Sequence, residues 1–398
     1  MSNHEMINNH VQIPITIPMD VDDTQQYILQ LTIQDNDIFA NPEPTNIKIN
    51  ISSKKNITVD TTQPISSSNV HTLQNAINLV DNYGTINIES DVNDENIILN
   101  KSITIQGNNH TLTNTNIVNN APEVLITNII SDTSRIINNA EIMIDSCNFN
   151  NNTDSAVVNN NKITIYECHF NNNSADYGAC VYIANQNAST IIDKCEFTNN
   201  EAQYYGGCIY SNKGNDTEIT NCAFYNNNKA TYNGTCISIY GNAYISGNTF
   251  YENNVNSNNE IYLMNGSIEM DKNIFDGAID SINILHGVVD ADLNYWGYNT
   301  EAEIQTLEDK YNIEINNYLI SRCDIIPRND NTYYVVGIID EYRNKFEIET
   351  TKITPIQSNL PVSVGSTVSS LNHRDIIVQN QTFKMKIGQA EVPEVAEQ

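Results

Sequence analysis

Positively charged residues are scarce in this sequence. Its 398 residues include 19 Lys and Arg against 48 Asp and Glu, which gives a formal net charge of −29. Nucleic-acid binding depends on Lys and Arg contacts to phosphate groups, usually gathered into a basic patch or stripe. The chain contains no such stripe, so we expect no nucleic-acid partner.

Long apolar runs are missing as well. No stretch of about 18 apolar residues occurs, so the sequence predicts no transmembrane helix and no membrane insertion. The first residues, Met1 to Met6, lack the charged and apolar regions of a secretory signal peptide. We therefore expect either a cytoplasmic protein or a segment of a longer exported chain.

The central part of the sequence repeats one short phrase, Cys-x-Phe. The phrase recurs every 21 to 27 residues, and Asn replaces Cys in its last two copies. A second phrase, Tyr followed by Gly and Cys, recurs between these copies with its Cys residues 28 apart. Two independent markers with nearly the same period indicate a solenoid or array. The first phrase begins at Cys147, Cys168, Cys195, Cys222, Asn248 and Asn273, and the second at Tyr177, Tyr205 and Tyr232.

Each repeat predicts short strands joined by sharp corners. Apolar and polar residues alternate before every Cys-x-Phe, as in residues 163–165, which is typical of a strand with one buried face. Asn-rich stretches such as 171–173 follow, and Asn tolerates the left-handed backbone angles of tight corners. One such circuit is one coil of a right-handed parallel β-helix. Coils stack at the strand spacing of about 4.8 Å, so Phe, Ile and Cys would form inward ladders and Asn would form corner ladders.

Two other repeat folds fit the sequence less well. A β-propeller blade needs about 40–50 residues for its four strands, which is longer than this repeat. A leucine-rich repeat fits the length, but Leu is sparse and no helix-like half-repeat appears. The parallel β-helix is therefore the fold that we predict.

We expect an all-β protein in which this β-helix is flanked by immunoglobulin-like β-sandwich modules. Residues 1–63 contain alternating runs at 27–33, 46–51 and 56–59, which predict a sandwich too short for a complete module of about 100 residues. An incomplete module favours the interpretation as a segment of a longer exported chain. Residues 64–298 predict the β-helix, 299–312 a linker that could be helical, and 313–398 a second sandwich with a frayed tail.

Both ends of the predicted β-helix carry elements that could close its core. Leu73, Ala76, Ile77 and Val80 have helical spacing and predict a capping helix within residues 71–82. The end coil of a solenoid would otherwise expose its core and an unpaired strand edge. At the other end, Trp296 is the only Trp and predicts a large aromatic plug.

These residues resemble a known group of surface proteins. Residues 197–200 followed by 205–209 are similar to the repeats of chlamydial polymorphic outer-membrane proteins, which are adhesins with a right-handed β-helix passenger. Residues 70–320 as a whole resemble the adhesin-like proteins of methanogenic archaea, in which a β-helix closes with a phrase like Asn294-Tyr-Trp-Gly297 and immunoglobulin-like repeats follow. The resemblance implies a non-catalytic adhesin at the cell surface or outside the cell.

Cysteine usage predicts packing rather than chemistry. Seven of the eight cysteines lie in the repeats, in two ladders, and Cys323 stands apart. No Cys-x-x-Cys or Cys–His spacing of a metal site occurs. Parallel Cβ vectors in neighbouring coils fit the disulfide dihedral poorly. We expect free, buried thiols that act as small apolar residues.

A carbohydrate-active β-helix enzyme, a polysaccharide lyase or hydrolase, is the alternative interpretation. Such sites need clustered carboxylates, usually with a cation nearby. Asp193–Lys194 and Asp271–Lys272 hold equivalent repeat positions, so repetition explains them without catalysis. The densest acidic group comprises Asp276, Asp280, Asp290 and Asp292. It could bind calcium, but we interpret it as a solvated acidic face. We expect no enzyme, no cofactor, and no catalytic, cofactor-binding or metal residues.

Tyrosine is the residue type that points most directly to a partner. Tyr204, Tyr205, Tyr225, Tyr232, Tyr240 and Tyr251 are predicted to be exposed on a flank rich in Asn. Such a flank suits stacking on sugars or contact with a protein, and packing between coils at the corners is the other interpretation. His169 is predicted to lie at the surface because it alternates with Cys168 and Phe170. We expect a monomer that binds a cell-surface glycan or protein.

Overall fold

The computed structural model describes the side chains of residues 54–319 except 214–215, 228–229, 251–252, 254–258, 276–281 and 297–300; outside that range it describes strand backbones only. The chain divides into two units, residues 1–55 and 56–398. The first contains the antiparallel pair β1 (Gln26–Leu31) and β2 (Thr45–Asn50). Beyond residue 319, β34 (Ile320–Arg328), β35 (Asn331–Ile339) and β37 (Val362–Val364) form one sheet, and β36 (Ile353–Ser358), β38 (Phe383–Ile387) and β39 (Ala390–Val392) form another. The side-chain packing that would define the two expected sandwiches lies outside the described residues.

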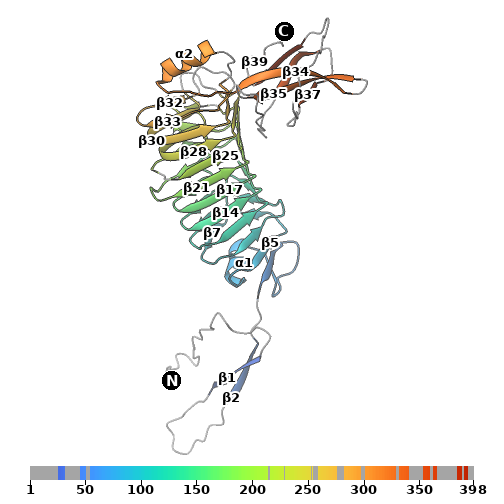
Figure 1. Cartoon of the computed structure of the whole chain (residues 1–398). Helices are drawn as coiled ribbons and strands as arrows, with labels where there is room; N and C mark the ends of the chain where they lie inside the picture. Colours follow the sequence, from blue (N-terminus) through green and yellow to red (C-terminus); the bar gives the residue numbers. More distant parts are fainter. Residues whose placement is uncertain are drawn as a thin grey trace, which may run out of the picture. The chain divides into compact units, whose positions relative to one another are not determined.

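The predicted all-β class and parallel solenoid are confirmed. Of the residues that the structure describes, 7% are in helices and 49% in strands, and the solenoid has about eight coils (Figure 1). Each coil runs through three faces before it climbs to the next coil, and equivalent strands pair in parallel. The alternation of buried and exposed residues along every strand explains this arrangement, because one side of each strand must face the core.

The first face is the longest of the three. It consists of β3 (Asn56–Val59), β5 (Thr85–Ile88), β8 (Thr104–Gln106), β11 (Val124–Thr127), β14 (Glu141–Asp145), β17 (Lys162–Tyr166), β21 (Ser189–Asp193), β25 (Thr217–Thr220), the second halves of β28 (Ile237–Ser246) and β30 (Ile261–Asp271), and β33 (Val288–Asp290).

The second face is a sheet of nine strands. They are β6 (Val92–Asn93), β9 (Thr111–Thr113), β12 (Ile130–Asp132), β15 (Asn148–Asn150), β18 (His169–Asn171), β22 (Glu196–Thr198), β26 (Ala223–Tyr225), β29 (Thr249–Tyr251) and β31 (Ile274–Phe275).

The third face completes the coil. It consists of β7 (Asn96–Leu99), β10 (Asn116–Asn119), β13 (Ile136–Asn138), β16 (Val157–Asn159), β20 (Val181–Ile183), β24 (Ile209–Ser211), the first halves of β28 and β30, and β32 (Ile282–Ile284). The two-residue strand β4 (Asn69–Val70) pairs with β3.

A small extra sheet lies between the second and third faces in the later coils. It is formed by β19 (Ser174–Tyr177), β23 (Glu201–Tyr205) and β27 (Lys229–Ala230). The repeat lengthens from 21 to 27 residues after Cys168, and part of the added length lies here, since the connection grows from residues 151–156 in one coil to residues 172–180 in the next. The change in period therefore marks where this extra sheet begins.

One predicted boundary is wrong. We placed residues 56–59 in the N-terminal sandwich, but β3 pairs in parallel with β5 and is the first strand of the solenoid's first face. Ile57 and Val59 are buried in the core of the solenoid. The alternation correctly predicts a strand at residues 56–59, but alternation alone cannot distinguish a strand of an antiparallel sandwich from a strand of a parallel coil.

The predicted phenylalanine column is confirmed. Six Phe rings and Trp296 stack along the inside of the second face with ring centroids 4.7–5.0 Å apart and ring planes within 8° of parallel. The members are Phe149, Phe170, Phe197, Phe224, Phe250 and Phe275, all fully buried. Trp296 is the last ring of the column and is 1% exposed, in agreement with its predicted position at the end of the repeats.

Asparagine ladders follow the corners, as predicted. After the second face, Asn151, Asn172, Asn199 and Asn226 adopt positive φ values of 51–57°. The next residue in each coil is buried and donates its amide to the equivalent Asn of the following coil, at 2.9–3.2 Å. This buried ladder comprises Asn152, Asn173, Asn200, Asn227 and Asn253. It satisfies backbone groups that would otherwise be unpaired at the corner.

A short helix covers the first coil. Helix α1 (Leu73–Leu79) buries Leu73, Ala76 and Ile77 against the core, as the spacing predicts. Glu95 accepts hydrogen bonds from the backbone N–H groups of Leu73 and Gln74, both at 3.0 Å. Lys101 donates to three carbonyls at the other end of the helix, at 2.7–3.1 Å. The negative charge of Glu95 at the N-terminus and the positive charge of Lys101 at the C-terminus interact favourably with the helix dipole and hold α1 on the first coil.

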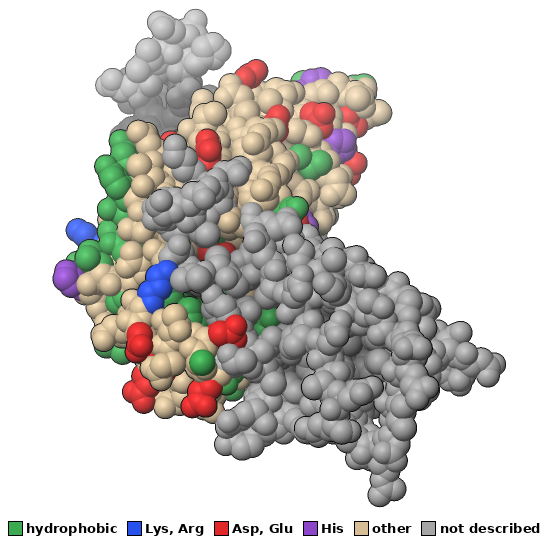
Figure 2. Space-filling view, turned by 90° about the horizontal axis from the view of Figure 1, so that it is seen from above, with side chains coloured by type: hydrophobic (Ala, Val, Ile, Leu, Met, Phe, Trp, Pro, Cys, Tyr) green, Lys and Arg blue, Asp and Glu red, His purple; other side chains and the backbone are tan. Residues whose placement is uncertain are grey.

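A second helix lies beyond the last coil, in the region predicted as a linker. Helix α2 (Glu301–Tyr311) buries Ile304 and Leu307, which belong to the same core as the solenoid. Residues 301–311 therefore contribute to the core of the second unit rather than forming a separate spacer. The face of the molecule seen in Figure 2 carries scattered acidic side chains and few basic ones among its described residues.

Candidate functional site

Seven tyrosines form a continuous cluster where the extra sheet meets the third face. We call this group the tyrosine cluster. Its members are Tyr177, Tyr182, Tyr204, Tyr205, Tyr210, Tyr232 and Tyr262, and successive rings lie 5.1–6.4 Å apart. They belong to β19, β20, β23, β24 and β30, with Tyr232 in the loop after β27. The parallel stacking of coils brings these residues together although they span 85 positions of the sequence.

The cluster has a buried floor and an exposed rim. Tyr210 is 6% exposed and Tyr262 is 5% exposed, whereas Tyr232 is 52% exposed. Burial and the neighbouring phenols raise the pKa of Tyr210 to about 12, so its hydroxyl remains protonated at neutral pH. That hydroxyl donates to Asn212 Oδ1 at 3.4 Å, and Asn212 Nδ2 donates to Tyr182 at 3.2 Å. The rim therefore offers phenol and amide groups on a rigid aromatic base.

The rings contact one another along the solenoid axis. Tyr205 stacks on Tyr262 with an interplanar angle of 10°, and Tyr204 on Tyr232 with 13°. Both interpretations of the tyrosines thus have support: the inner rings pack between coils, and the outer rings are accessible. A partner would meet mainly ring edges and hydroxyl groups, with the exposed ring of Tyr232 available for stacking.

The six tyrosines named from the sequence have different surroundings. Tyr204, Tyr205 and Tyr232 belong to the tyrosine cluster, in which Tyr232 is exposed as predicted but Tyr204 and Tyr205 are half-buried. Tyr225 is half-buried at the end of β26, Tyr240 is 39% exposed, and the side chain of Tyr251 lies outside the described residues. The sequence reasoning missed the other four members, Tyr177, Tyr182, Tyr210 and Tyr262. Tyr177 could have been found, because it holds the same place in its Tyr-Gly-Cys phrase as Tyr205.

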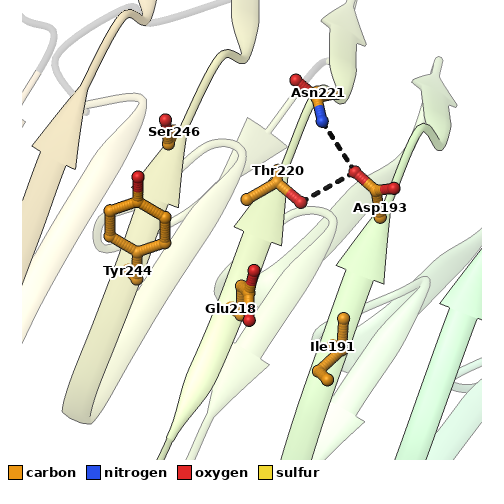
Figure 3. A pocket seen from close by; sticks show the side chains of 7 residues that line it. All are labelled: Ile191, Asp193, Glu218, Thr220, Asn221, Tyr244 and Ser246. Carbon is orange, nitrogen blue, oxygen red and sulfur yellow. Dashed lines mark hydrogen bonds between the residues drawn. The ribbon is translucent and has the colours of Figure 1, made fainter.

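The outer side of the first face carries a depression of about 430 Å³ (Figure 3). We call it the first-face depression. It spans three neighbouring coils and is lined by Ile191 and Asp193 of β21, Glu218 and Thr220 of β25, Asn221, and Tyr244 and Ser246 of β28. Two carboxylates, hydroxyl groups, an amide and one aromatic ring thus surround a single hollow. Sequence reasoning had noted only Asp193 among them, and had explained it by repetition.

Hydrogen bonds hold two side chains of this depression in position. Asp193 Oδ1 accepts from Thr220 Oγ1 at 2.8 Å and from Asn221 Nδ2 at 2.9 Å (Figure 3). At the other side, the hydroxyl of Tyr244 donates to Asp271 Oδ1 at 3.1 Å. Asp271 also pairs with Lys272 at 2.7 Å, and hydrogen bonds with Lys272, Ser246 and Tyr244 lower its pKa although burial opposes them. The ring of Tyr244 is therefore anchored at the rim.

The other charged residues singled out in the sequence have structural roles or lie outside the described part. Asp292 Oδ1 accepts from the backbone N–H of Asn316 at 2.8 Å, and Asp290 is exposed on β33. Asp276 and Asp280 lie outside the described residues. Among the described side chains, no three His, Cys, Asp or Glu residues lie close enough together to hold a metal ion.

His169 lies at the surface, as predicted. Its ring is exposed on β18 and lies 3.6 Å from Glu196 of the next coil. A hydrogen bond to that carboxylate raises the pKa of His169, and partial burial opposes the shift. The contact links two neighbouring coils and gives His169 a simple structural explanation.

The seven described cysteines are free and buried, as predicted. Burial raises the pKa of Cys147, Cys168, Cys195 and Cys208 well above the usual thiol value, so these thiols are protonated and poor nucleophiles. They do more than fill space, however. The Sγ atom of Cys168 accepts from the backbone N–H of Cys147 at 3.4 Å and donates to the carbonyl of Tyr166 at 3.2 Å.

Comparison with known proteins adds no assignment for either surface. No protein-family model matches the chain, and no curated protein matches it. Within the described residues, no helix is both long enough and apolar enough to cross a membrane. Functional inference therefore depends on the tyrosine cluster and the first-face depression themselves.

Proposed function

We propose that this chain is a non-catalytic, adhesin-like segment of a cell-surface or extracellular protein. A right-handed parallel β-helix, set between immunoglobulin-like modules, would hold an Asn- and Tyr-rich face toward a cell-surface glycan or protein. The tyrosine cluster is the observation that carries this proposal. Rigid aromatic groups with hydroxyl tips provide contact area at low conformational cost, which is why they are enriched at binding surfaces.

The rigidity of the scaffold supports the same proposal. Each cluster tyrosine lies on or beside a strand that pairs with an equivalent strand of a neighbouring coil. Side chains on such strands lose little freedom on binding, so less of the contact energy is spent on ordering them. Acidic partners are disfavoured by the net charge of −29.

A binding experiment with matched tyrosine variants tests this proposal. The chain would be applied to a glycan array and to immobilised cell-surface protein, alongside Tyr204→Ser and Tyr232→Ser. We expect each variant to lose about tenfold or more in affinity for the glycan or protein that binds at the tyrosine cluster, since truncating an aromatic anchor typically costs over 1 kcal/mol. Tyr83→Ser is the control, because Tyr83 is 72% exposed but lies in an early coil. Equal binding by all three variants would argue against the proposal.

A carbohydrate-active enzyme is the second candidate, and the first-face depression is the observation that favours it. Asp193 and Glu218 are carboxylates on neighbouring strands that line one hollow. Glycoside hydrolysis needs two carboxylates facing one bond. A reducing-end assay on pectin, alginate and neutral polysaccharides, with and without calcium, separates the candidates. Turnover that disappears in Asp193→Asn would support the enzyme, and binding without turnover would support the adhesin.

A further inference from the structure

The first-face depression results from a local change in side-chain size. Equivalent residues of successive coils stand in register on the outer side of this face, in the order Tyr166, Asp193, Thr220, Ser246 and Asp271. Thr220 and Ser246 are the two smallest members of this column. They leave a hollow between Asp193 and Asp271, whose strands are three strand spacings, or roughly 14 Å, apart.

The corner beside the hollow leaves room for the side chain of Asn221. Gly247 has a φ of 69°, and a Cβ atom at this position would lie 2.7 Å from Asn221 Oδ1. Lys194 and Lys272 hold the same corner position in other coils and have positive φ as well. Positive φ alone therefore does not require Gly here. The absent side chain instead gives the Asn221 amide room to reach Asp193, where its Nδ2 donates at 2.9 Å.

Polar and apolar groups converge on this hollow from different coils. Asp193 has one carboxylate oxygen engaged by Thr220 and Asn221, and Glu218 is exposed on the adjacent strand. Ile191 and the anchored ring of Tyr244 flank Glu218 in the neighbouring register positions. Carboxylate oxygens accept hydrogen bonds from pairs of hydroxyl groups, and an aromatic ring packs against the C–H face of a sugar ring.

The charge of the lining narrows the ligand class. The seven lining residues include two carboxylates and no Lys or Arg. Uronic acids, sulfated sugars and phosphorylated ligands would be repelled. A divalent cation is disfavoured too, because no three His, Cys, Asp or Glu side chains gather among the described residues. A ligand rich in hydroxyl groups fits the mixture of carboxylates, hydroxyls and amide.

We propose that the first-face depression is a binding subsite for a neutral pyranose unit of a glycan. Glu218 and the open side of Asp193 accept hydrogen bonds from sugar hydroxyls, and Tyr244 packs against the ring. The site lies on the first face and uses none of the residues of the tyrosine cluster. Sugar binding at the first-face depression can therefore be confirmed or refuted independently of the binding proposed for the tyrosine cluster.

Calorimetric titration with defined sugars tests the proposal. The chain would be titrated with neutral tetrasaccharides of glucose, galactose, mannose and N-acetylglucosamine. Tetragalacturonate, spermidine and calcium chloride represent acidic, cationic and metal ligands. We expect binding of at least one neutral tetrasaccharide, and a loss of affinity of about tenfold or more in both Glu218→Gln and Tyr244→Ala.

Two control variants separate this site from others. Glu269→Gln changes the next carboxylate along the same column as Glu218 and Tyr244, outside the lining, and should bind as the unmodified chain does. Tyr232→Ser should also leave this binding unchanged, because it alters only the tyrosine cluster. Circular dichroism of every variant shows whether the fold is retained.

Several results would overturn the proposal. They are the absence of binding to every neutral tetrasaccharide, binding that Glu218→Gln and Tyr244→Ala leave unchanged, and stronger binding of spermidine, calcium or tetragalacturonate. Release of reducing ends from a bound tetrasaccharide would show that the depression is a catalytic site and not a binding subsite alone. If Tyr244→Ala fails to fold, Tyr244→Phe tests the anchor instead, since it removes only the hydroxyl that binds Asp271.

Discussion

At the scale of single residues, one interior position explains why Asn can replace Cys in the last two copies of the repeat. Asn248 accepts from the backbone N–H of Cys222 at 2.8 Å and donates to the carbonyl of Ile219 at 2.9 Å. Cys222 bonds its own neighbours in the same pattern, with weaker sulfur contacts to the N–H of Cys195 at 3.4 Å and the carbonyl of Ile192 at 3.7 Å. A thiol and an amide therefore make the same hydrogen bonds at this position, whereas an apolar side chain, such as that of Ile129 in the coil before Cys147, packs there without making them.

Replacing Cys222 by Asn or by Val tests this equivalence. In Cys222→Asn the new amide can extend the existing ladder toward Asn248, so we expect a free energy of unfolding within about 1 kcal/mol of the unmodified chain. Cys222→Val has a similar volume but leaves backbone groups without partners, and should lose about 1–3 kcal/mol. Urea unfolding followed by circular dichroism measures both. Higher stability for Val than for Asn would contradict the hydrogen-bonding role.

The raised thiol pKa values predict instability in alkali. The pKa of these thiols is higher in the folded chain than the value of about 9 in the unfolded chain. The protonated thiol therefore contributes its full stabilisation below pH 9, and this contribution is lost as the pH rises above that value. We expect the free energy of unfolding to fall between pH 8 and pH 10.5, in the direction that Tyr210 also favours. Urea titrations across this range measure it.

Alkylation with iodoacetamide gives an independent check on the thiols. In a Cys323→Ser background, the seven remaining cysteines should react slowly in the folded chain at pH 8 and rapidly in urea, because each is buried. Fast labelling of the folded chain would mean that the thiols are accessible. Mass spectrometry counts the labelled residues.

At the scale of elements, α1 shows how a helix of seven residues can be stable as a cap. Isolated helices of this length do not form in water. Burial of Leu73, Ala76 and Ile77 on the first coil supplies one part of its stability. Glu95 at its N-terminus and Lys101 at its C-terminus supply the other, and both come from the coil beneath.

Removing either charge should loosen the cap without unfolding the solenoid. We expect Glu95→Ala and Lys101→Met each to lower the local opening free energy of residues 73–79 by about 1 kcal/mol, as for the loss of a helix cap. Hydrogen exchange of those amides measures the change. Lys162→Met is the matched control, since it breaks the exposed pair with Glu141 on a central coil. Equal hydrogen-exchange protection of residues 73–79 in the two cap variants and in the control would contradict the stabilising role of Glu95 and Lys101.

At the scale of the whole molecule, the coils bind one another through repeated contacts while their charges repel. The net charge of −29 is spread over the chain, and the basic residues are too few to neutralise it. Stacked Phe rings, Asn ladders and strand pairing must therefore offset a self-repulsion that acts along the entire solenoid.

Salt should strengthen the fold for this reason. Raising NaCl from about 20 mM to about 0.5 M shortens the screening length to a few Å and weakens the repulsion between coils. We expect Tm to rise by several degrees, as a gain of 1–2 kcal/mol produces in a chain of this size. Differential scanning calorimetry measures the shift, and KCl should reproduce it because screening does not depend on the cation. A constant or falling Tm would contradict this account.

The sequence by itself determined the coil. The Phe positions and the alternation before them define an inward face, and in a stack of parallel coils the equivalent residues of each repeat lie above one another. The Phe column, the free thiols, the α1 cap and the Asn corners could all be predicted for that reason. The position of β3 could not, since a strand's alternation does not identify the strand with which it pairs.

Only the tertiary structure decided which outer side chains act together. The tyrosine cluster joins residues from 177 to 262, and the first-face depression joins Asp193, Glu218 and Tyr244 from three coils. A repeat aligns these residues in columns, but a hollow depends on the volumes of successive side chains in a column, such as the small Thr220 and Ser246 before Asp271. Burial selects apolar residues at core positions, so these positions can be recognised from the sequence. Surface sites depend on three-dimensional neighbours, which the order of residues does not reveal.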